Sequence, residues 1–201
     1  MCGRLGDPAD PLITESVDQL VAEMTSSAWA LEKFLLTKDN YTVTDPTYYG
    51  SKFYTEEDHG TAHLSLVDSW GNAVAVTSTI NQEFGAEIRS PTTGIIFNDQ
   101  MDDFSYPGIT NGFNLPPSPS NFVVPGKRPL SSMAPSVFVD GAGEVRLVVG
   151  ASGGTKITTA TALVAVLTEL QGWQLEQSVD TPRLHHQLSP MEVGRCTELV
   201  T

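Results

Sequence analysis

Apolar and polar residues alternate differently in the N-terminal part of the chain and in the remainder. From Ile13 to Leu36 the apolar residues recur every three or four positions, at Val17, Leu20, Val21, Met24, Ala28, Leu31, Phe34 and Leu35. This spacing places them along one side of a helix, so it predicts one amphipathic helix or two consecutive ones. Residues 37 to 60 are polar and contain Asp45-Pro46 and Tyr49-Gly50, which indicates an extended connector that is open to cleavage.

Two later segments alternate with the period of a β-strand. Ala62–Val67 and Ala73–Thr79 flank the turn-forming residues 68 to 72, and they predict a β-hairpin. Met133–Asp140 and Glu144–Val149, linked by Gly141-Ala142-Gly143, predict a second hairpin.

The other segments are assigned by their glycines, prolines and apolar runs. Gly94–Phe97 predicts a short buried strand, whereas residues 105 to 129 hold six prolines and predict a long surface loop. A helix is predicted to begin at Gly153-Gly154-Thr155 and to run to about Leu170, with Gly172 as its stop. Leu175–Val179 predicts one more short helix. Hairpins followed by helices favour a layered α/β protein with antiparallel sheets.

Composition narrows the class of protein. The chain has 201 residues, 40% of them hydrophobic, which is enough for one ordinary core. The net charge of −13 and only 11 Lys and Arg residues argue against a nucleic-acid partner. Cys2 and Cys196 lie near opposite ends, which supports neither a disulfide framework nor a zinc site.

Other candidate features are weaker. No apolar run of membrane-spanning length and no leader-like segment is present, so we expect neither a signal nor an anchor in the chain as written. Asn40-Tyr41-Thr42 is a glycosylation sequon, which has meaning only in a secreted protein. The four histidines do not recur at ligand spacing, so no metal site is expected; they are His59, His63, His185 and His186. For His63 we expect a packing role on the strand face that Thr61 shares.

The Gly60-Thr61 step is the strongest candidate for chemistry. If this peptide bond were cut, Thr61 would carry a nucleophilic hydroxyl and a free α-amine. An α-amino group titrates near ~7.7 to 8.0, so at neutral pH it can accept the hydroxyl proton. The alternative is an ordinary strand threonine after a glycine turn.

Five ordered motifs resemble the γ-glutamyltransferase family, also called glutathione hydrolases. They are Thr61–Ser65, Thr77–Asn81, Asn98–Ser105, Pro129–Met133 and Gly150–Thr155. The resemblance implies an α/β fold, the four-layer αββα sandwich of the N-terminal nucleophile hydrolases, incomplete because most of the large subunit is absent. Residues 1–60 would be the tail of the large subunit, ending at the autocleavage junction. Residues 61–190 would be the small catalytic subunit, and residues 191–201 a divergent C-terminal tail.

The resemblance also implies roles for individual residues. Thr61 would cut the Gly60-Thr61 bond and then accept the γ-glutamyl group, while Thr79 would orient its hydroxyl. Gly153 and Gly154 would supply backbone N–H groups for the negative charge that develops on the carbonyl oxygen. Without the neighbouring motifs, Thr79 would be assigned as a strand residue and the glycine pair as a strand-to-helix turn.

A γ-glutamyl donor carries a free α-amine and a free α-carboxylate. By the resemblance, Gln100 and Asp103 would accept from the amine with help from Asn81, and Ser131 and Ser132 would donate to the carboxylate. An acidic turn and a polar loop are the structural alternatives for these motifs. No residue matches the arginine that pairs with the donor carboxylate in relatives.

The resemblance therefore implies γ-glutamyl transfer and hydrolysis of glutathione and related compounds, without a cofactor. Glutathione and other γ-glutamyl donors, amino acid or dipeptide acceptors and a large subunit would be the partners. Related enzymes face the outside of the plasma membrane. The alternative is an inactive, light-chain-like fragment or partner module that needs a large subunit.

Overall fold

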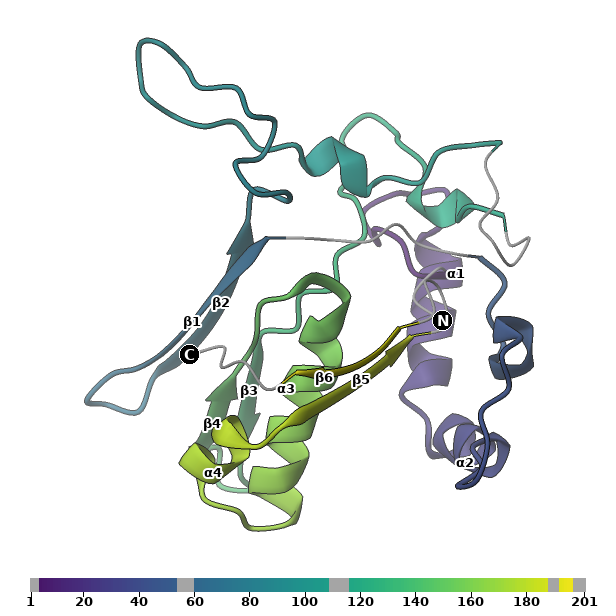
Figure 1. Cartoon of the computed structure of the whole chain (residues 1–201), viewed down its shortest axis with the longest axis vertical. Coiled ribbons are helices and arrows are strands. Elements are labelled where there is room, and N and C mark those ends of the chain that lie inside the picture. The colour runs from purple at the N-terminus through teal and green to yellow at the C-terminus, as the bar shows by residue number, and fades with distance from the viewer. Residues whose placement is uncertain (1–3, 54–59, 109–115, 188–191, 197–201) are drawn as a thin grey trace. The chain divides into compact units, whose positions relative to one another are not determined.

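A computed structural model describes residues 4–53, 60–108, 116–187 and 192–196, the last of these by backbone alone. Figure 1 traces the chain from its N-terminus in purple to its C-terminus in yellow. The chain divides into two compact units. One consists of Met1–Glu56, Met101–Leu130 and Leu188–Met191, and the other of Glu57–Gln100, Ser131–Gln187 and Glu192–Thr201. The second unit contains the Gly60-Thr61 step.

The first unit contains the predicted N-terminal helices. The apolar segment forms two consecutive helices, α1 (Thr14–Met24) and α2 (Ser27–Leu36), which is one of the two predicted arrangements. Val17 and Leu20 are the buried residues of α1. Ser26 separates the helices, because its hydroxyl accepts from the backbone N–H of Trp29 at 3.2 Å and so caps α2. Short 3-10 turns follow at η2 (Pro46–Tyr49), η3 (Gln100–Asp103) and η4 (Pro119–Asn121).

The prediction of a surface loop for residues 105 to 129 is wrong in part. Ser105, Ser118 and Asn121 are fully buried. The side-chain amide of Asn121 donates to the carbonyl of Asp103 at 2.8 Å, and its oxygen accepts from the N–H of Leu130 at 2.8 Å. Polar side chains thus satisfy the backbone of a proline-rich segment, and an apolar pattern does not report such burial.

The second unit begins with the predicted first hairpin, which is confirmed. Strands β1 (Thr61–Val67) and β2 (Ala73–Thr79) pair antiparallel, with Thr61 opposite Thr79. Asp68 closes the turn by accepting from the N–H groups of Trp70 and Asn72, both at 2.9 Å. Hydrogen bonds from Asn72 and its neighbours hold the pKa of Asp68 below its ordinary value.

The second hairpin and the helix after it are also confirmed. Strands β3 (Ser136–Val139) and β4 (Val145–Val149) pair antiparallel, and helix α3 (Ile157–Ala165) continues into the π-helical turn η6 (Val166–Leu170). Four buried side chains form a hydrophobic cluster between β4 and α3: Leu147, Val149, Val164 and Ala165. Since β1 and β2 contact the second hairpin, the order of layers is hairpin, hairpin, helix.

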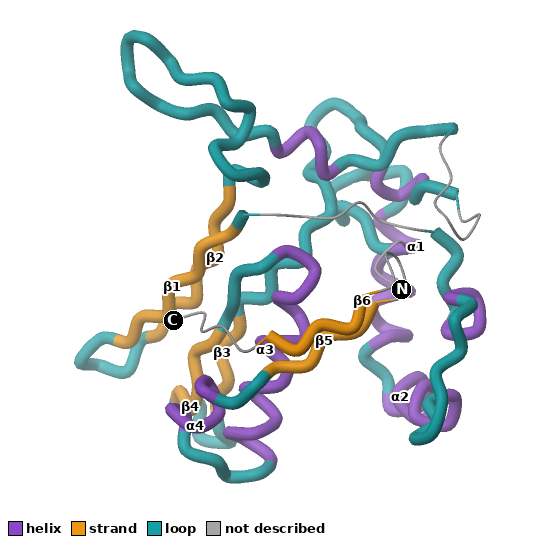
Figure 2. The backbone as a smooth tube through the Cα atoms, in the orientation of Figure 1, coloured by secondary structure: helices purple, strands orange, loops and turns teal. Residues whose placement is uncertain are grey.

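The remaining elements show where prediction failed. Helix α4 (Leu175–Asp180) is confirmed, but β5 (Arg183–Gln187) and its partner β6 (Glu192–Cys196) were not predicted. The β5 segment has only one apolar residue in five, so it lacks a strand alternation. The described strands form three two-stranded sheets (Figure 2).

The predicted buried strand at Gly94–Phe97 is wrong. Ile95 and Phe97 are 57% and 50% exposed, and Ile96 forms only an isolated bridge with Arg89. The chain turns back at Ser90, whose N–H donates to the carbonyl of Ile95 at 2.8 Å. Residues 94 to 97 therefore pair only locally, with the residues just before the turn, and this pairing does not extend into a sheet.

Candidate functional site

The site centres on the junction between Gly60 and Thr61. Thr61 opens β1, and its hydroxyl oxygen is buried without a hydrogen-bond partner in the part of the chain that the structure describes. The hydroxyl of Thr79, the cross-strand neighbour, donates to the carbonyl oxygen of Gly60. By the resemblance Thr79 would orient the Thr61 hydroxyl, and in this structure the Thr79 hydroxyl contacts the carbonyl oxygen of Gly60 instead. A donor at that oxygen polarises the carbonyl toward attack.

Asn81 holds Thr79 in place. Its backbone N–H donates to the Thr79 hydroxyl oxygen at 2.7 Å, so the Thr79 proton is directed to Gly60. Asn81 is 2% exposed and has a φ of 74°, a left-handed conformation in which asparagine is enriched. Its side-chain amide donates to the carbonyl of Asp99 at 3.4 Å.

Asp99 is a structural residue that the sequence interpretation missed. Its carboxylate accepts from the N–H of Gln82 at 3.1 Å, and its own N–H donates to the carbonyl of Ile80 at 3.2 Å. Asp99 therefore binds the backbone of the residues before and after Asn81, which are Ile80 and Gln82. Asp99 lies inside the Asn98–Ser105 motif, and this position could have indicated its role. Within that motif, roles were expected only for residues that would contact the substrate.

Gly60 is suited to this junction for two reasons. Its φ is 70°, a conformation that L side chains rarely adopt. A Cβ at this position would lie 2.5 Å from the carbonyl oxygen of Asn81. The close approach of the two backbones therefore requires glycine.

His63 lies between its own hairpin and the backbone that follows β4. Its ring nitrogens Nδ1 and Nε2 bond the hydroxyls of Thr77 at 2.8 Å and Ser65 at 3.0 Å. The imidazole occupies the space that a Cβ of Gly150 would need. The expected packing role of His63 is thereby confirmed.

Gly153 and Gly154 lie at the end of the loop after β4. Their φ values are 120° and 58°, and Gly154 begins the turn η5 (Gly154–Lys156), which leads into α3. The carbonyl of buried Gly154 accepts from the hydroxyl of Ser132 at 2.9 Å. The structure thus joins two candidate motifs. The hydroxyl of exposed Ser131 accepts from the N–H of Met133 at 3.2 Å.

The candidate residues for the donor amine lie at η3. The N–H of Gln100 donates to the side chain of Asn98 at 3.0 Å. Asp103 is 7% exposed and belongs to the first unit, whereas Gln100 belongs to the second. Their contacts with a donor stay predictions, as do the oxyanion role of the glycines and the carboxylate role of the serines.

Further candidates are settled only in part. Among the described residues no group of three His, Cys, Asp or Glu side chains could hold a metal ion. His59 and Cys2 lie outside the described residues. Asn40 is exposed. No helix in the described segments is long and apolar enough to cross a membrane.

Several known proteins resemble this chain over most of its length. Scoloptoxin SSD14 of Scolopendra dehaani is 48% identical over 94% of this chain and 32% of its own. Glutathione hydrolase proenzyme 1 of Schizosaccharomyces pombe is 43% identical over 90% of this chain and 28% of its own. The chain therefore spans about a third of the length of these relatives. The Putative inactive glutathione hydrolase 4 of Arabidopsis thaliana differs, since 96% of its length is covered at 44% identity.

Solved structures agree with the fold. A mutant gamma-glutamyltranspeptidase of Helicobacter pylori matches with a TM-score of 0.59 at 39% identity, over 65% of this chain and 70% of that one. The Pseudomonas nitroreducens enzyme matches with a TM-score of 0.57 at 43% identity, over 64% and 66%. The fold is thus an incomplete α/β fold of the N-terminal nucleophile hydrolase type. The family model for Gamma-glutamyltranspeptidase matches residues 3–198, and the chain belongs to that family.

Proposed function

We propose that this chain cuts itself between Gly60 and Thr61 and then transfers γ-glutamyl groups through Thr61. The observation that carries the proposal is the arrangement at the junction. A buried hydroxyl without a described partner belongs to Thr61, and the neighbouring Thr79 donates to the carbonyl of Gly60. Nucleophile and polarised carbonyl are adjacent along the chain.

The cut is an acyl shift followed by hydrolysis. The Thr61 oxygen attacks the carbonyl carbon of Gly60, an ester bond forms, the amide bond breaks, and the hydroxyl proton passes to the Thr61 nitrogen. Water then hydrolyses the ester. Gly60 is released with a carboxylate, and Thr61 keeps its hydroxyl and a free α-amine.

The same hydroxyl then serves the transfer reaction. The new α-amine accepts the hydroxyl proton as Thr61 attacks the γ-carbonyl of glutathione or a related amide. The γ-glutamyl ester forms on Thr61, the γ-amide bond breaks, and the leaving amine takes up that proton. Water, or the amine of an amino acid or dipeptide, then attacks the ester, accepts the γ-glutamyl group and restores the Thr61 hydroxyl. We assign the oxyanion to the N–H groups of Gly153 and Gly154, because glycines lead into the turn before α3.

Donor recognition completes the proposal. Asn81, Gln100 and Asp103 would accept from the donor ammonium, and Ser131 and Ser132 would donate to its carboxylate. The contact between Ser132 and Gly154 supports a shared wall for carboxylate and oxyanion. A large subunit would supply the remainder of the binding site.

Intact-mass spectrometry of the purified chain at neutral pH tests the cut. We expect two fragments, residues 1–60 and 61–201, and a single uncut mass from Thr61→Ala. A Thr61→Ala chain that still cuts at this bond would remove Thr61 as the nucleophile. Release of product from a γ-glutamyl amide then tests transfer.

A second candidate function is an inactive partner module that binds a large subunit supplied by another chain. The likeness to the Arabidopsis protein of similar length, whose name is Putative inactive glutathione hydrolase 4, favours it. Activity of the isolated chain would argue against this module. Activity that arises only when the large subunit of a homologue is added would support it.

We also propose an extracellular location, as expected from the family. Exposed Asn40, two residues before Thr42, offers a test. With a secretion signal fused ahead of the chain, expression in a eukaryotic cell should give a glycan on Asn40 that Asn40→Gln removes. A secreted chain without a glycan on Asn40 would contradict the location.

A further inference from the structure

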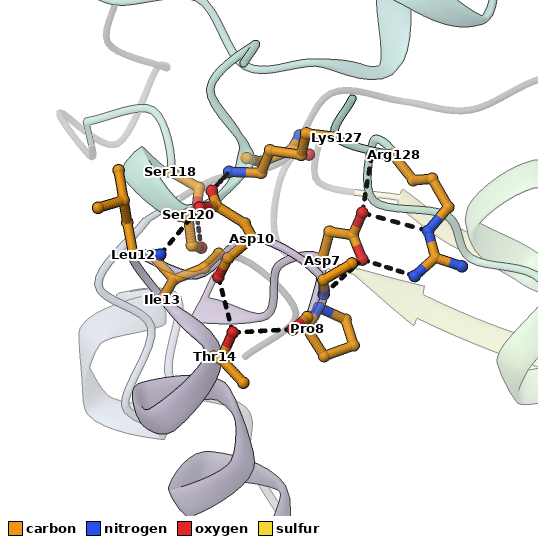
Figure 3. Close-up of polar contacts among 12 residues, drawn as sticks. Asp7, Pro8, Asp10, Leu12, Ile13, Thr14, Ser118, Ser120, Lys127 and Arg128 are labelled. Carbon is orange, nitrogen blue, oxygen red and sulfur yellow. Dashed lines mark hydrogen bonds and ion pairs between the residues drawn. The ribbon is translucent and has the colours of Figure 1, made fainter. Parts of the chain in front are cut away.

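Two buried carboxylates join the beginning of the chain to a segment more than a hundred residues later. Asp7 contacts Arg128, and Asp10 contacts Lys127, across 121 and 117 positions of sequence (Figure 3). All four residues belong to the first unit. Every one of these contacts connects a residue before the Gly60-Thr61 step with a residue after it.

The carboxylate of Asp7 accepts three hydrogen bonds from Arg128. Its two oxygens accept from Nη2 and Nε of Arg128 at 2.6 and 3.1 Å, and from the backbone N–H of Arg128 at 2.9 Å. The Asp7 side chain is 1% exposed, whereas that of Arg128 is 73% exposed. Such a planar, bidentate contact fixes direction as well as charge.

Asp10 and Lys127 form a pair that is buried at both ends. The ammonium lies 2.9 Å from the carboxylate, and the two side chains are 3% and 4% exposed. The other carboxylate oxygen accepts from the N–H of Leu12 at 3.0 Å. Separating a buried pair leaves each charge without its partner, which is unfavourable.

Neutral contacts continue the same junction. The hydroxyl of Ser120 donates to the carbonyl of Leu5 at 2.8 Å. Gly6 approaches the backbone so closely that a Cβ there would overlap the carbonyl oxygen of Ser120. The residues around Asp7 and Asp10 are therefore fitted to the segment that ends at Arg128.

We propose that Asp7 and Asp10 form an ion-pair clasp with Arg128 and Lys127 that keeps the N-terminal fragment bound after the chain is cut. The cut itself rests on the proposed function. Before it, the connector holds both parts at a high effective concentration; after it, only noncovalent contacts hold them. The clasp supplies charge-assisted contacts with a fixed register at this point.

The test uses an added protease to cut the chain, so that it does not depend on Thr61. In a Thr61→Ala chain, residues 54–59 are replaced by the recognition sequence of a site-specific protease. Loss of the N-terminal fragment can then be distinguished from a failure of the chain to cut itself. After complete cutting, native mass spectrometry over a dilution series measures the binding of the N-terminal fragment. The variants are Asp10→Asn and Arg128→Gln. Asp18→Asn is the control, an exposed acid on α1 with no ion pair among the described residues.

We expect the parent and Asp18→Asn to stay bound, and each clasp variant to bind about 30-fold or more weakly. Circular dichroism of the uncut variants checks that they fold. If uncut Asp10→Asn is unfolded, a double-mutant cycle of Asp7→Asn with Arg128→Gln measures the coupling instead. Equal binding by parent and variants, release of the fragment by the parent, or no coupling in the cycle would overturn the clasp.

Discussion

Thr79 faces Thr61 across the β1–β2 ladder, and its hydroxyl donates to the carbonyl of Gly60 rather than to the Thr61 hydroxyl. For the proposed cut, this contact places Thr79 on the carbonyl that Thr61 would attack. The N–H of Asn81, at 2.7 Å from the Thr79 oxygen, leaves the Thr79 proton for Gly60. A role of Thr79 in the proposed cut can therefore be tested apart from any role in transfer.

Replacing Thr79 with valine should slow self-cleavage about 100-fold or more, because one preformed donor to the developing oxyanion is lost. Thr79→Ser keeps the hydroxyl and should cut within about tenfold of the parent rate. The measurement is the time course of the two fragment masses. Ser78→Ala, on the opposite face of the same strand, should cut at the parent rate, and a Thr79→Val chain that does the same would show that this contact is not catalytic.

Gly60→Ala should block or strongly slow the cut. The backbone at this position has a φ of 70°, which is unfavourable for alanine. The added Cβ would also lie 2.5 Å from the carbonyl oxygen of Asn81. Gly71→Ala is the matched control, since Gly71 also has a positive φ, of 84°, but open space around it. Equal thermal stability and equal cutting of the two variants would mean that the close approach to Asn81 has no effect.

Gly150→Ala should displace the His63 ring and destabilise the second unit by about 1–3 kcal/mol, as overpacking does. Gly141→Ala, where a Cβ meets nothing within 4 Å, is the control. Urea unfolding measures the difference. In a His63→Ala background the Gly150→Ala cost should largely disappear, and a cost that persists there would place its cause elsewhere.

Acid should weaken the clasp. Hydrogen bonds from Arg128 hold the pKa of Asp7 well below its ordinary value, and the hydrogen bond from Lys127 lowers the pKa of Asp10. Because these carboxyls titrate lower in the folded chain than near ~3.9 in the unfolded one, their stabilisation is complete above that pH. It is lost as the pH falls through the folded pKa values.

The uncut Thr61→Ala chain should therefore be more stable than its Asp7→Asn/Asp10→Asn derivative at pH 7. The difference should narrow below about pH 4. Urea midpoints between pH 7 and pH 2 measure it. The groups that face the two carboxylates are Arg128 and Lys127, and each carboxylate also lies near the other. A difference that does not change with pH would exclude the carboxylates as its cause.

The candidate site was predictable where its residues lie close along the chain. The Gly60-Thr61 step and the hairpin follow from alternation and turn residues. The structure adds the register, which places Thr61 opposite Thr79. Asp99 and Gly150 were not predicted in their roles. Their partners, Asn81 and His63, are distant in sequence, and no local pattern encodes those contacts.

Sequence alone determined the local elements, namely the helices, the two hairpins and the motifs of the family. Helix and strand periodicity depends on neighbours within a few residues, so it is visible in the chain itself. Tertiary structure alone decided which carbonyl the Thr79 hydroxyl meets, that Ser105, Ser118 and Asn121 are buried, and that Asp7 and Asp10 pair with Arg128 and Lys127. Such contacts join residues that are separate along the chain, and their partners are fixed only when folding buries polar groups that must then be satisfied.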